Sequence, residues 1–146
     1  MERPRVIQVE VTNRCNLNCV MCIRRYWRAE PADMELSLFK KIAREGFSEL
    51  SRLDLYGFGE PLTNPRFLDM VRVAREHLPK DSELMFSTNG TLLSPSIADK
   101  VVGEKGATEV FFSIDAYDAN TLREIRAGVD ADVVFRNLLS LAKHPK

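Results

Sequence analysis

The stretch that decides the fold is VIQVEVTNRCNLNCVMC, residues 6–22. Its first part, residues 6–11, is short and rich in β-branched side chains, which predicts a β-strand. Its second part carries Cys15, Cys19 and Cys22 in the spacing C-x3-C-x2-C, and these are the only cysteines of the chain. The sequence therefore predicts a strand that runs into a loop in which three thiols come together.

Three thiols in one short loop indicate a metal centre. Cysteine thiolates are the ligands of iron–sulfur clusters, and three of them leave one iron of a [4Fe–4S] cube without a protein ligand. A coordination position left open makes a metal site reactive. Two alternatives are a zinc site and three incidental buried thiols. Zinc needs a fourth ligand, and the two histidines are His77, in a predicted helix, and His144, among the last three residues.

Strand-like and helix-like segments alternate along the rest of the chain. Further strands are expected at residues 53–56, 84–87 and 110–114. Helices are expected to begin at Ser37, at Asn64–Pro65, at Ser94–Pro95, after Asp118 and after Asp132. This alternation predicts right-handed βαβ units and a parallel sheet, so the expected fold class is α/β.

Polar and glycine-containing loops follow the predicted strands. They read GFGEP at residues 57–61, STNG at residues 87–90 and SID at residues 113–115. Because the carboxyl ends of parallel strands meet at one rim, these loops and the cysteine loop are expected to lie together. That rim is the candidate site.

Length and charge narrow the classes of function. A chain of 146 residues fits one domain without a linker. Lys plus Arg and Asp plus Glu number 21 each, so a net charge of zero favours neither nucleic acid nor a membrane as partner. No apolar run spans a bilayer, and residues 1–5 show no signal-peptide h-region. The odd, clustered cysteines are a poor disulfide framework, which favours a cytoplasmic location.

The cysteine motif after the first strand resembles that of the radical S-adenosylmethionine (SAM) superfamily, and the other three loops are similar to segments of that family. The resemblance covers essentially the whole chain and implies a TIM-like (βα) barrel. It implies a [4Fe–4S] cluster on Cys15, Cys19 and Cys22, with SAM chelated at the open iron. One electron from an external reductant then cleaves SAM to a 5′-deoxyadenosyl radical, which abstracts a hydrogen atom from the substrate. The branch that the motifs resemble favours a peptide or a cofactor precursor as substrate.

The resemblance also implies a set of SAM contacts. Gly57, Gly59 and Glu60 resemble the family's GGE motif, with Phe58 at its first glycine, and are expected to hold the SAM amino group. A glycine lets the backbone approach a ligand, and a carboxylate pairs with an ammonium group. Asn89, in a segment similar to the family's TNG, is expected to face the same methionine moiety. By composition alone, both segments are ordinary turns.

Three further residues and one residue pair complete the expected site. Side chains alternate on a strand, so Ser113 and Asp115 are expected on one face, suited to the ribose hydroxyls or the carboxylate of SAM. Met21 holds the family position whose backbone lies against adenine, and Arg126 resembles an arginine that reaches the SAM carboxylate. Ser87 is an alternative to Asn89. The open alternatives are a solvated strand end for the pair, simple packing for Met21 and a solvated helix face for Arg126.

The basic and aromatic run RRYWR, residues 24–28, has two interpretations. It either meets an anionic substrate or forms a solvated loop beside the cluster. The second interpretation is favoured.

The chain departs from the family in extent. The family barrel has six βα units and this sequence provides about four, so residues 1–146 are expected to be a truncated core. The outer edge of residues 110–114 then lacks a neighbour, and an apolar edge invites pairing with another chain. A fragment is the favoured explanation, and a barrel completed by a partner chain or second copy and a natural minimal form are the alternatives.

Two other functions compete with the enzyme. One is a non-catalytic fragment or partner subunit that binds an iron–sulfur cluster or zinc without cleaving SAM. The other is a scaffold subunit whose edge strand completes another chain, which predicts a stable complex that tolerates loss of the cysteines.

Overall fold

The computed structural model describes residues 5–103 and 105–143. The elements follow one another as β1 (Val6–Gln8), η1 (Ile23–Arg25), α1 (Leu36–Gly46), β2 (Arg52–Leu55), η2 (Pro61–Thr63), α2 (Phe67–His77), β3 (Glu83–Thr88), α3 (Pro95–Val101), β4 (Glu109–Phe112), α4 (Ala119–Ile125) and α5 (Ala131–Ala142). The elements η1 and η2 are single turns of 3₁₀-helix.

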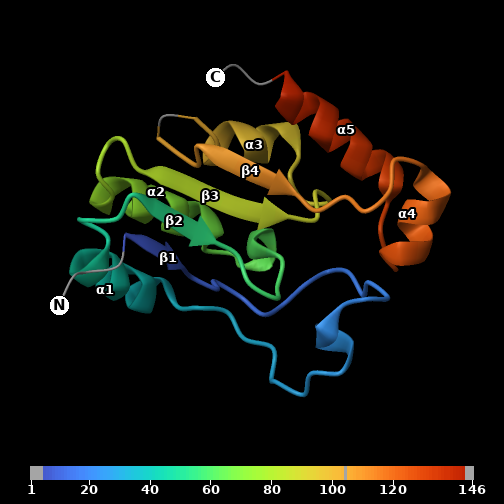
Figure 1. The fold of residues 1–146 in the computed structure, drawn as a ribbon, viewed down its shortest axis with the longest axis horizontal. Helices are drawn as coiled ribbons and strands as arrows, with labels where there is room; N and C mark the ends of the chain where they lie inside the picture. Colours follow the sequence, from blue (N-terminus) through green and yellow to red (C-terminus); the bar gives the residue numbers. More distant parts are fainter. Residues whose placement is uncertain (1–4, 104, 144–146) are drawn as a thin grey trace.

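The strands form one parallel sheet in the order β1-β2-β3-β4. Parallel neighbours need crossover connections, and α1, α2 and α3 supply them. Figure 1 shows α2 and α3 behind the sheet and α4 beyond the carboxyl ends of the strands. The predicted α/β class with about four βα units is confirmed.

Aromatic side chains fill the main core between the sheet and the helices. Phe39, Phe47, Phe67 and Phe86 are fully buried. The rings of Phe39 and Phe47 meet edge to face with centroids 5.7 Å apart, and those of Phe67 and Phe86 do so at 5.3 Å. Each such side chain contributes on the order of 1.5–3 kcal/mol through burial, so this core fixes the sheet that carries the loops.

A second, smaller core lies under the cysteine loop. Its buried members are Leu17, Leu122, Val129, Ala131 and Val134, and Cys15 and Cys19 pack against it. Because α4 and α5 supply most of this cluster, these two helices hold the cysteine loop by apolar packing.

Two strands are shorter than the sequence pattern predicts. β1 ends at Gln8 and not at residue 11, because β2, the strand with which it pairs in the described part of the chain, ends at Leu55. The backbone N–H of Val9 still donates to Asp54 O (2.8 Å). β4 ends at Phe112 and not at residue 114. The N–H of Ser113 donates to Thr88 O (2.8 Å), after which the chain turns away from β3.

Three predicted helix starts are wrong. α1 begins at Leu36, one residue before Ser37, and Glu35 occupies its N-cap position without a side-chain capping bond. α2 follows Arg66, because the Asn64 side chain accepts from Arg66 N and donates to Val11 O. α5 begins before Asp132, because Asp130 accepts hydrogen bonds from the first-turn N–H groups. The starts at Ser94–Pro95 and after Asp118 are confirmed.

Several expectations concern the surface and the chain ends. Among the described residues, β4 pairs with β3 alone, and its Phe111 is 58% exposed. None of the helices in the described part combines the length and the apolar character that crossing a bilayer requires.

His77 lies on α2 with Nδ1 2.9 Å from Val73 O. His144 and residues 1–4, on which parts of the zinc and signal-peptide arguments rest, lie outside the described residues.

Candidate active site

One pocket lies at the carboxyl ends of the strands and receives all four loops. Its lining residues are Cys15, Cys19, Cys22, Tyr56, Gly57, Phe58, Gly59, Glu60, Ser87, Thr88, Asn89, Ser113 and Arg126. The structure therefore brings together all the predicted site residues except Met21 and Asp115. The parallel sheet is the cause, because it delivers each loop to the same rim.

The cysteine loop is held against the end of α4 by its backbone. The N–H of Asn18 donates to Ala127 O and that of Val20 donates to Ile125 O, both at 2.9 Å. The side chain of Leu17, which lies between Cys15 and Asn18 in the sequence, is buried as a member of the second core. The loop therefore has a defined shape in the protein alone, with its thiols turned to the pocket.

The three thiols are free and half-buried. Burial raises the pKa of the Cys19 thiol, and the positive charge of Arg126 opposes this shift, while Cys15 and Cys22 add to it. Arg126, Cys15 and Cys22 therefore all lie within electrostatic range of the Cys19 sulfur atom.

The donor set fits an iron–sulfur cluster with one position free of protein ligands. Within residues 5–103 and 105–143, no group of three His, Cys, Asp or Glu side chains surrounds a point where one metal ion would sit. A cubic cluster does not require such a point, because each cysteine binds a different iron atom. The three thiols line the same pocket, so each can bind one of three iron atoms of a single cluster.

Glu60 is the buried acid of the site, with 2% of its surface exposed. Its Oε1 accepts from Thr88 Oγ1 (2.8 Å) and Leu62 N (3.3 Å), and its Oε2 accepts from Asn89 N (2.6 Å). Burial raises the pKa of this carboxyl group, whereas these hydrogen bonds and the charge of Arg126 oppose the shift. A carboxylate oxygen accepts two hydrogen bonds, so Oε2 keeps capacity for one more donor.

The two glycines before Glu60 allow backbone segments to meet. A Cβ atom on Gly59 would overlap the carbonyl oxygens of Thr12 and Arg14, and one on Gly57 would overlap the carboxylate of Glu10. That carboxylate accepts a hydrogen bond from Phe58 N (2.5 Å). Gly57 and Gly59 therefore allow the loops after β1 and β2 to pack closely. This structural role was not predicted, since both glycines were expected only to contact the ligand.

The serine and asparagine side chains differ in orientation. Ser87 and Ser113 place their hydroxyl oxygens 3.1 Å apart at the pocket wall. Asn89 turns its amide toward the cysteine loop, where Nδ2 donates to Asn16 Oδ1 (2.9 Å) and lies 3.8 Å from Cys15 Sγ. The asparagine thus contacts a cysteine, a partner that the sequence pattern did not suggest.

Asp115 and Met21 lie outside the pocket lining. Asp115 follows the end of β4, so strand alternation does not apply to it, and its Oδ2 accepts from Arg126 Nε (2.6 Å). The carboxylate therefore orients the arginine that lines the pocket. Met21 is 56% exposed. Its expected contact is a backbone one, which stays a prediction.

Sequence analysis missed several residues that build the site. Tyr56 and Phe58 line the pocket from positions that flank Gly57, and Thr88 lies beside Asn89 in a loop already singled out. A hydroxyl next to the predicted asparagine was a usable signal for Thr88. Glu10 offered no such signal, because it alternates with valines as any polar strand residue does.

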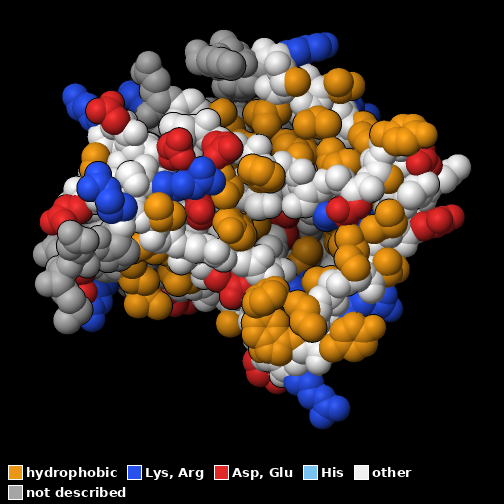
Figure 2. Space-filling view, viewed as in Figure 1, with side chains coloured by type: hydrophobic (Ala, Val, Ile, Leu, Met, Phe, Trp, Pro, Cys, Tyr) orange, Lys and Arg blue, Asp and Glu red, His pale blue; other side chains and the backbone are white. Residues whose placement is uncertain are grey.

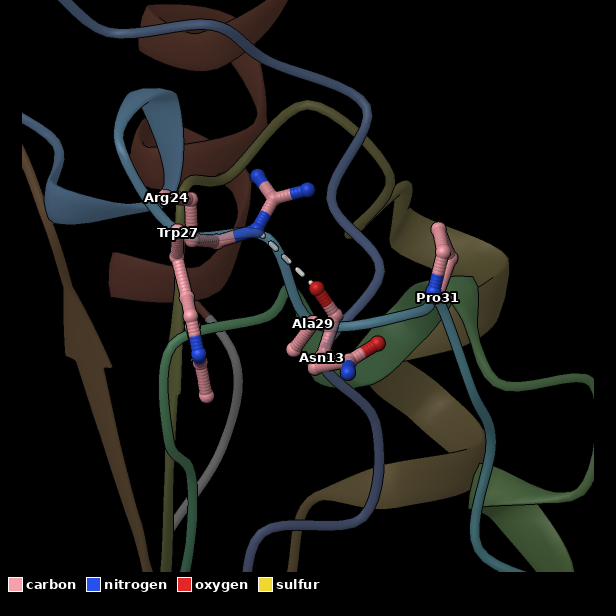
Figure 3. Close-up of a pocket in the computed structure, with 5 residues that line it drawn as sticks. All are labelled: Asn13, Arg24, Trp27, Ala29 and Pro31. Atoms are coloured by element: carbon pink, nitrogen blue, oxygen red, sulfur yellow. Dashed lines mark hydrogen bonds between the residues drawn. The ribbon is translucent and has the colours of Figure 1, made fainter.

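The segment after the cysteines folds back over the start of its own loop. Figure 3 shows Arg24 reaching Asn13, where Nε donates to the backbone carbonyl at 2.9 Å. Asn13 in turn accepts from Ala32 N through Oδ1 (2.7 Å). Arg24 therefore serves an internal contact, which leaves Arg25 and Arg28 as the exposed arginines of the run.

An apolar surface adjoins the pocket. Ile23, Tyr26, Trp27 and Phe58 line a shallow depression, and the rings of Trp27 and Phe58 meet edge to face at 4.8 Å. Figure 2 shows hydrophobic side chains gathered over the segment around η1. Phe58 lines both this depression and the cysteine pocket, so the two adjoin at this side chain.

The structure places the three cysteines at the rim of a parallel βα sheet, as the sequence predicts, and comparison with known proteins gives the family. The model of the Radical SAM superfamily matches residues 9–145. The chain belongs to the radical SAM superfamily. That membership implies SAM and a [4Fe–4S] cluster as cofactors.

Curated relatives carry the names of enzymes and of cofactor-modifying proteins. The chain is 41% identical over 134 residues to the tungsten-containing aldehyde ferredoxin oxidoreductase cofactor-modifying protein of Pyrococcus furiosus, covering 88% of this chain and 36% of that protein. It is 34% identical over 119 residues to the AdoMet-dependent heme synthase of Methanosarcina barkeri (81% and 33%). It is 29% identical over 146 residues to the mycofactocin maturase MftC of Mycobacterium tuberculosis (97% and 35%). The chain thus spans about a third of the length of these relatives.

Solved structures agree on the fold. The crystal structure of BtrN in complex with AdoMet and 2-DOIA superposes with a TM-score of 0.66 at 21% identity, covering 91% of this chain and 55% of that one. Methylornithine synthase (PylB) gives 0.67 at 18% identity, with coverage of 94% and 41%. At these identities the likeness concerns the fold, and the expectation of a TIM-like βα arrangement is confirmed.

Proposed function

We propose that this chain is the cluster- and SAM-binding core of an enzyme that cleaves SAM reductively and acts on a cofactor precursor or a peptide. One observation carries the proposal: Cys15, Cys19 and Cys22 share a single pocket with Glu60 and Arg126. Three soft ligands, a buried acid and a cation at one rim match the iron cluster, the ammonium group and the carboxylate group of bound SAM.

The protein residues have separate roles in this proposal. Cys15, Cys19 and Cys22 hold the cluster, which supplies the single electron for cleavage of SAM when it is bound. Glu60 receives the SAM ammonium at the remaining acceptor position of Oε2, since Oε1 already accepts two hydrogen bonds. Arg126 uses Nε for Asp115, so its terminal N–H groups are left to bind the SAM carboxylate.

The hydroxyl pair and the glycines complete the binding wall. Ser87 and Ser113, 3.1 Å apart, offer two hydroxyls that bind either the ribose hydroxyls or the carboxylate end of SAM. Gly57 and Gly59 hold the β2 loop close to the β1 loop, which keeps Glu60 in place. Met21 presents its backbone to the adenine base.

The names of the relatives support cofactor maturation, and the MftC relative supports a peptide as the alternative substrate. The apolar depression of Ile23, Tyr26, Trp27 and Phe58 is the part of the surface where a bound substrate would lie against this pocket. An external one-electron reductant completes the proposed system, and the edge of β4 that β3 does not occupy is the place where a further strand would pair.

A direct test is anaerobic reconstitution with iron and sulfide, followed by dithionite and SAM. The expected result is a brown protein that forms 5′-deoxyadenosine, detected by mass spectrometry. Cys19→Ala is expected to lose both the cluster and the product, whereas the surface variant Ser96→Ala keeps both. A cluster without product supports the non-catalytic cluster-binding alternative. A colourless zinc protein contradicts both cluster-binding interpretations and leaves the zinc-binding alternative.

A further inference from the structure

Three polar side chains beside Cys15 form a closed ring of hydrogen bonds. Asn89 Nδ2 donates to Asn16 Oδ1 (2.9 Å), Asn16 Nδ2 donates to Thr91 Oγ1 (2.7 Å), and the Thr91 hydroxyl donates to Asn89 Oδ1 (2.6 Å). Thr91 N adds a second donor to Asn89 Oδ1 (3.0 Å). Each donor meets an acceptor, so the ring fixes the orientation of both amides.

This orientation decides what faces the sulfur atom. Because Asn89 Oδ1 is held by Thr91, the NH₂ group must point the other way, and its second N–H lies toward Cys15 Sγ at 3.8 Å. The backbone N–H of Leu17 also donates to this sulfur (3.5 Å). Were the amide of Asn89 flipped, its oxygen would face an electron-rich sulfur and the ring would lose its donors.

The backbone of Asn89 is secured independently of its side chain. Its N–H donates to Glu60 Oε2 (2.6 Å), and the side chain of Asn137 on α5 donates to Gly90 O (2.8 Å). A change within the ring therefore reorients an amide and leaves the turn between β3 and α3 in place.

We propose that Thr91 and Asn16 are positioning residues that hold the Asn89 amide as a hydrogen-bond donor to the Cys15 sulfur, and thereby raise the reduction potential of the cluster. The inference rests on the proposed function only in that Cys15 carries a cluster. Hydrogen bonds to the sulfur ligands set the potential of such clusters. An N–H group beside the sulfur stabilises the reduced state, which carries more negative charge, so the electron is accepted more easily.

The test compares Thr91→Val with Thr91→Ser in the reconstituted protein without SAM. Valine keeps the shape of threonine but removes the hydroxyl that orients Asn89, whereas serine retains it. The cluster is titrated with reductant and its reduced form is followed by electron paramagnetic resonance. In Thr91→Val, the ratio of reduced to oxidised cluster at a fixed potential is expected to be about tenfold lower, which corresponds to a reduction potential lower by about 59 mV for one electron. Thr91→Ser is expected to match the wild type.

A second variant keeps the proposal open to refutation if Thr91→Val takes up less iron. Asn89→Asp has the size of asparagine but replaces the donor by an acceptor, so a shift in the same direction is expected. Wild-type potentials in both Thr91→Val and Asn89→Asp would overturn the proposal, as would equal shifts in Thr91→Val and Thr91→Ser. The shift is measured without SAM, so absence of 5′-deoxyadenosine refutes the proposed function and leaves this inference standing. Failure of the wild-type chain to bind a cluster overturns both.

Discussion

The carboxylate of Glu60 lies 2.6 Å from the backbone nitrogen of Asn89, a residue 29 positions further along the chain. The bond joins the loop after β2 to the end of β3, directly beside the cysteine loop. A buried acid is thus part of the framework that sets the shape of the pocket, in addition to its proposed contact with SAM.

Thr88 is the neutral donor to the same carboxylate, and Thr88→Val tests its contribution. Its hydroxyl donates to Glu60 Oε1 (2.8 Å) and accepts from Gly90 N (3.1 Å), and the residue is 1% exposed. Valine fills the space but leaves both partners without their hydrogen bond, which is expected to lower the free energy of unfolding by about 1–3 kcal/mol. Urea denaturation measures this, with exposed Ser96→Ala as a control expected to stay within about 0.5 kcal/mol. A valine variant as stable as that control would contradict the hydrogen-bond argument.

Gly59→Ala tests the close approach of two backbones. The added Cβ would overlap the carbonyl oxygens of Thr12 and Arg14, and backbone atoms do not move aside as a flexible side chain does. The free energy of unfolding is expected to fall by about 1–3 kcal/mol or more, as when a well-packed core is overfilled. Gly46→Ala is the matched control, because nothing lies within 4 Å of a Cβ there. It lies in α1, so alanine is expected to be neutral or to stabilise by up to about 1 kcal/mol. Equal effects of the two changes would refute the steric argument.

The sequence was sufficient to predict the parallel sheet and the meeting of the four loops at one rim. Strand and helix signals alternate, and a parallel sheet carries every strand end to one rim, so Cys15, Glu60 and Ser113 were expected together before any contact was known. Local propensity was a poorer guide to boundaries. Asn64 was predicted to cap a helix, yet its side-chain amide donates a hydrogen bond to Val11 O, 53 residues away.

The specific partners within the site depend on tertiary contacts that have no local signal. Asp115 was expected on the same face as Ser113, but β4 ends at Phe112 and the carboxylate meets Arg126. Asn89 was expected to face SAM, which stays a prediction; nothing in the sequence indicated that Asn16 and Thr91 would orient its amide toward Cys15. Such rings form only after two distant loops have been brought together by packing.

The pH dependence of stability should report the burial of Glu60. Burial raises the pKa of this group above its ordinary value of 4.5, so the folded chain retains a proton that the unfolded chain has released. Its contribution to stability is complete below pH 4.5 and is lost as the pH rises through the folded pKa. The free energy of unfolding of the wild type minus that of Glu60→Gln is therefore expected to fall with rising pH in this window, as measured by urea midpoints.

Asp118→Asn is the control of opposite sign. Hydrogen bonds from Thr121 lower the pKa of the Asp118 carboxyl group below its ordinary value of 3.8. Its contribution is present above that value and is lost as the pH falls through the folded pKa, so the corresponding difference is expected to rise with pH. Slopes of the same sign for the two residues would refute the assignment of Glu60 as a carboxyl group penalised by burial.

The charge of Arg126 is expected to control the reactivity of Cys19 in the cluster-free protein. Burial raises the pKa of the Cys19 thiol, and Arg126 opposes that rise. In a Cys15→Ser, Cys22→Ser background, Arg126→Gln removes the opposing charge and leaves Asp115 uncompensated, so both effects raise the thiol pKa further. Because the thiolate is the nucleophile, alkylation by iodoacetamide at a fixed pH slows, and its pH profile shifts upward.

Two control variants separate charge from structure at this position. Arg126→Lys keeps the positive charge and is expected to alkylate faster than Arg126→Gln. Arg123→Gln changes an arginine of α4, the helix that ends just before Arg126; Arg123 pairs with Asp132 at 3.0 Å, and its loss is expected to leave the profile of Cys19 unchanged. If Arg126→Gln and Arg123→Gln alkylate alike, the guanidinium of Arg126 does not act on the thiols in solution. The orientation of Arg126 by Asp115 would then be irrelevant to the pocket, and its assignment to the SAM carboxylate would lose its electrostatic support.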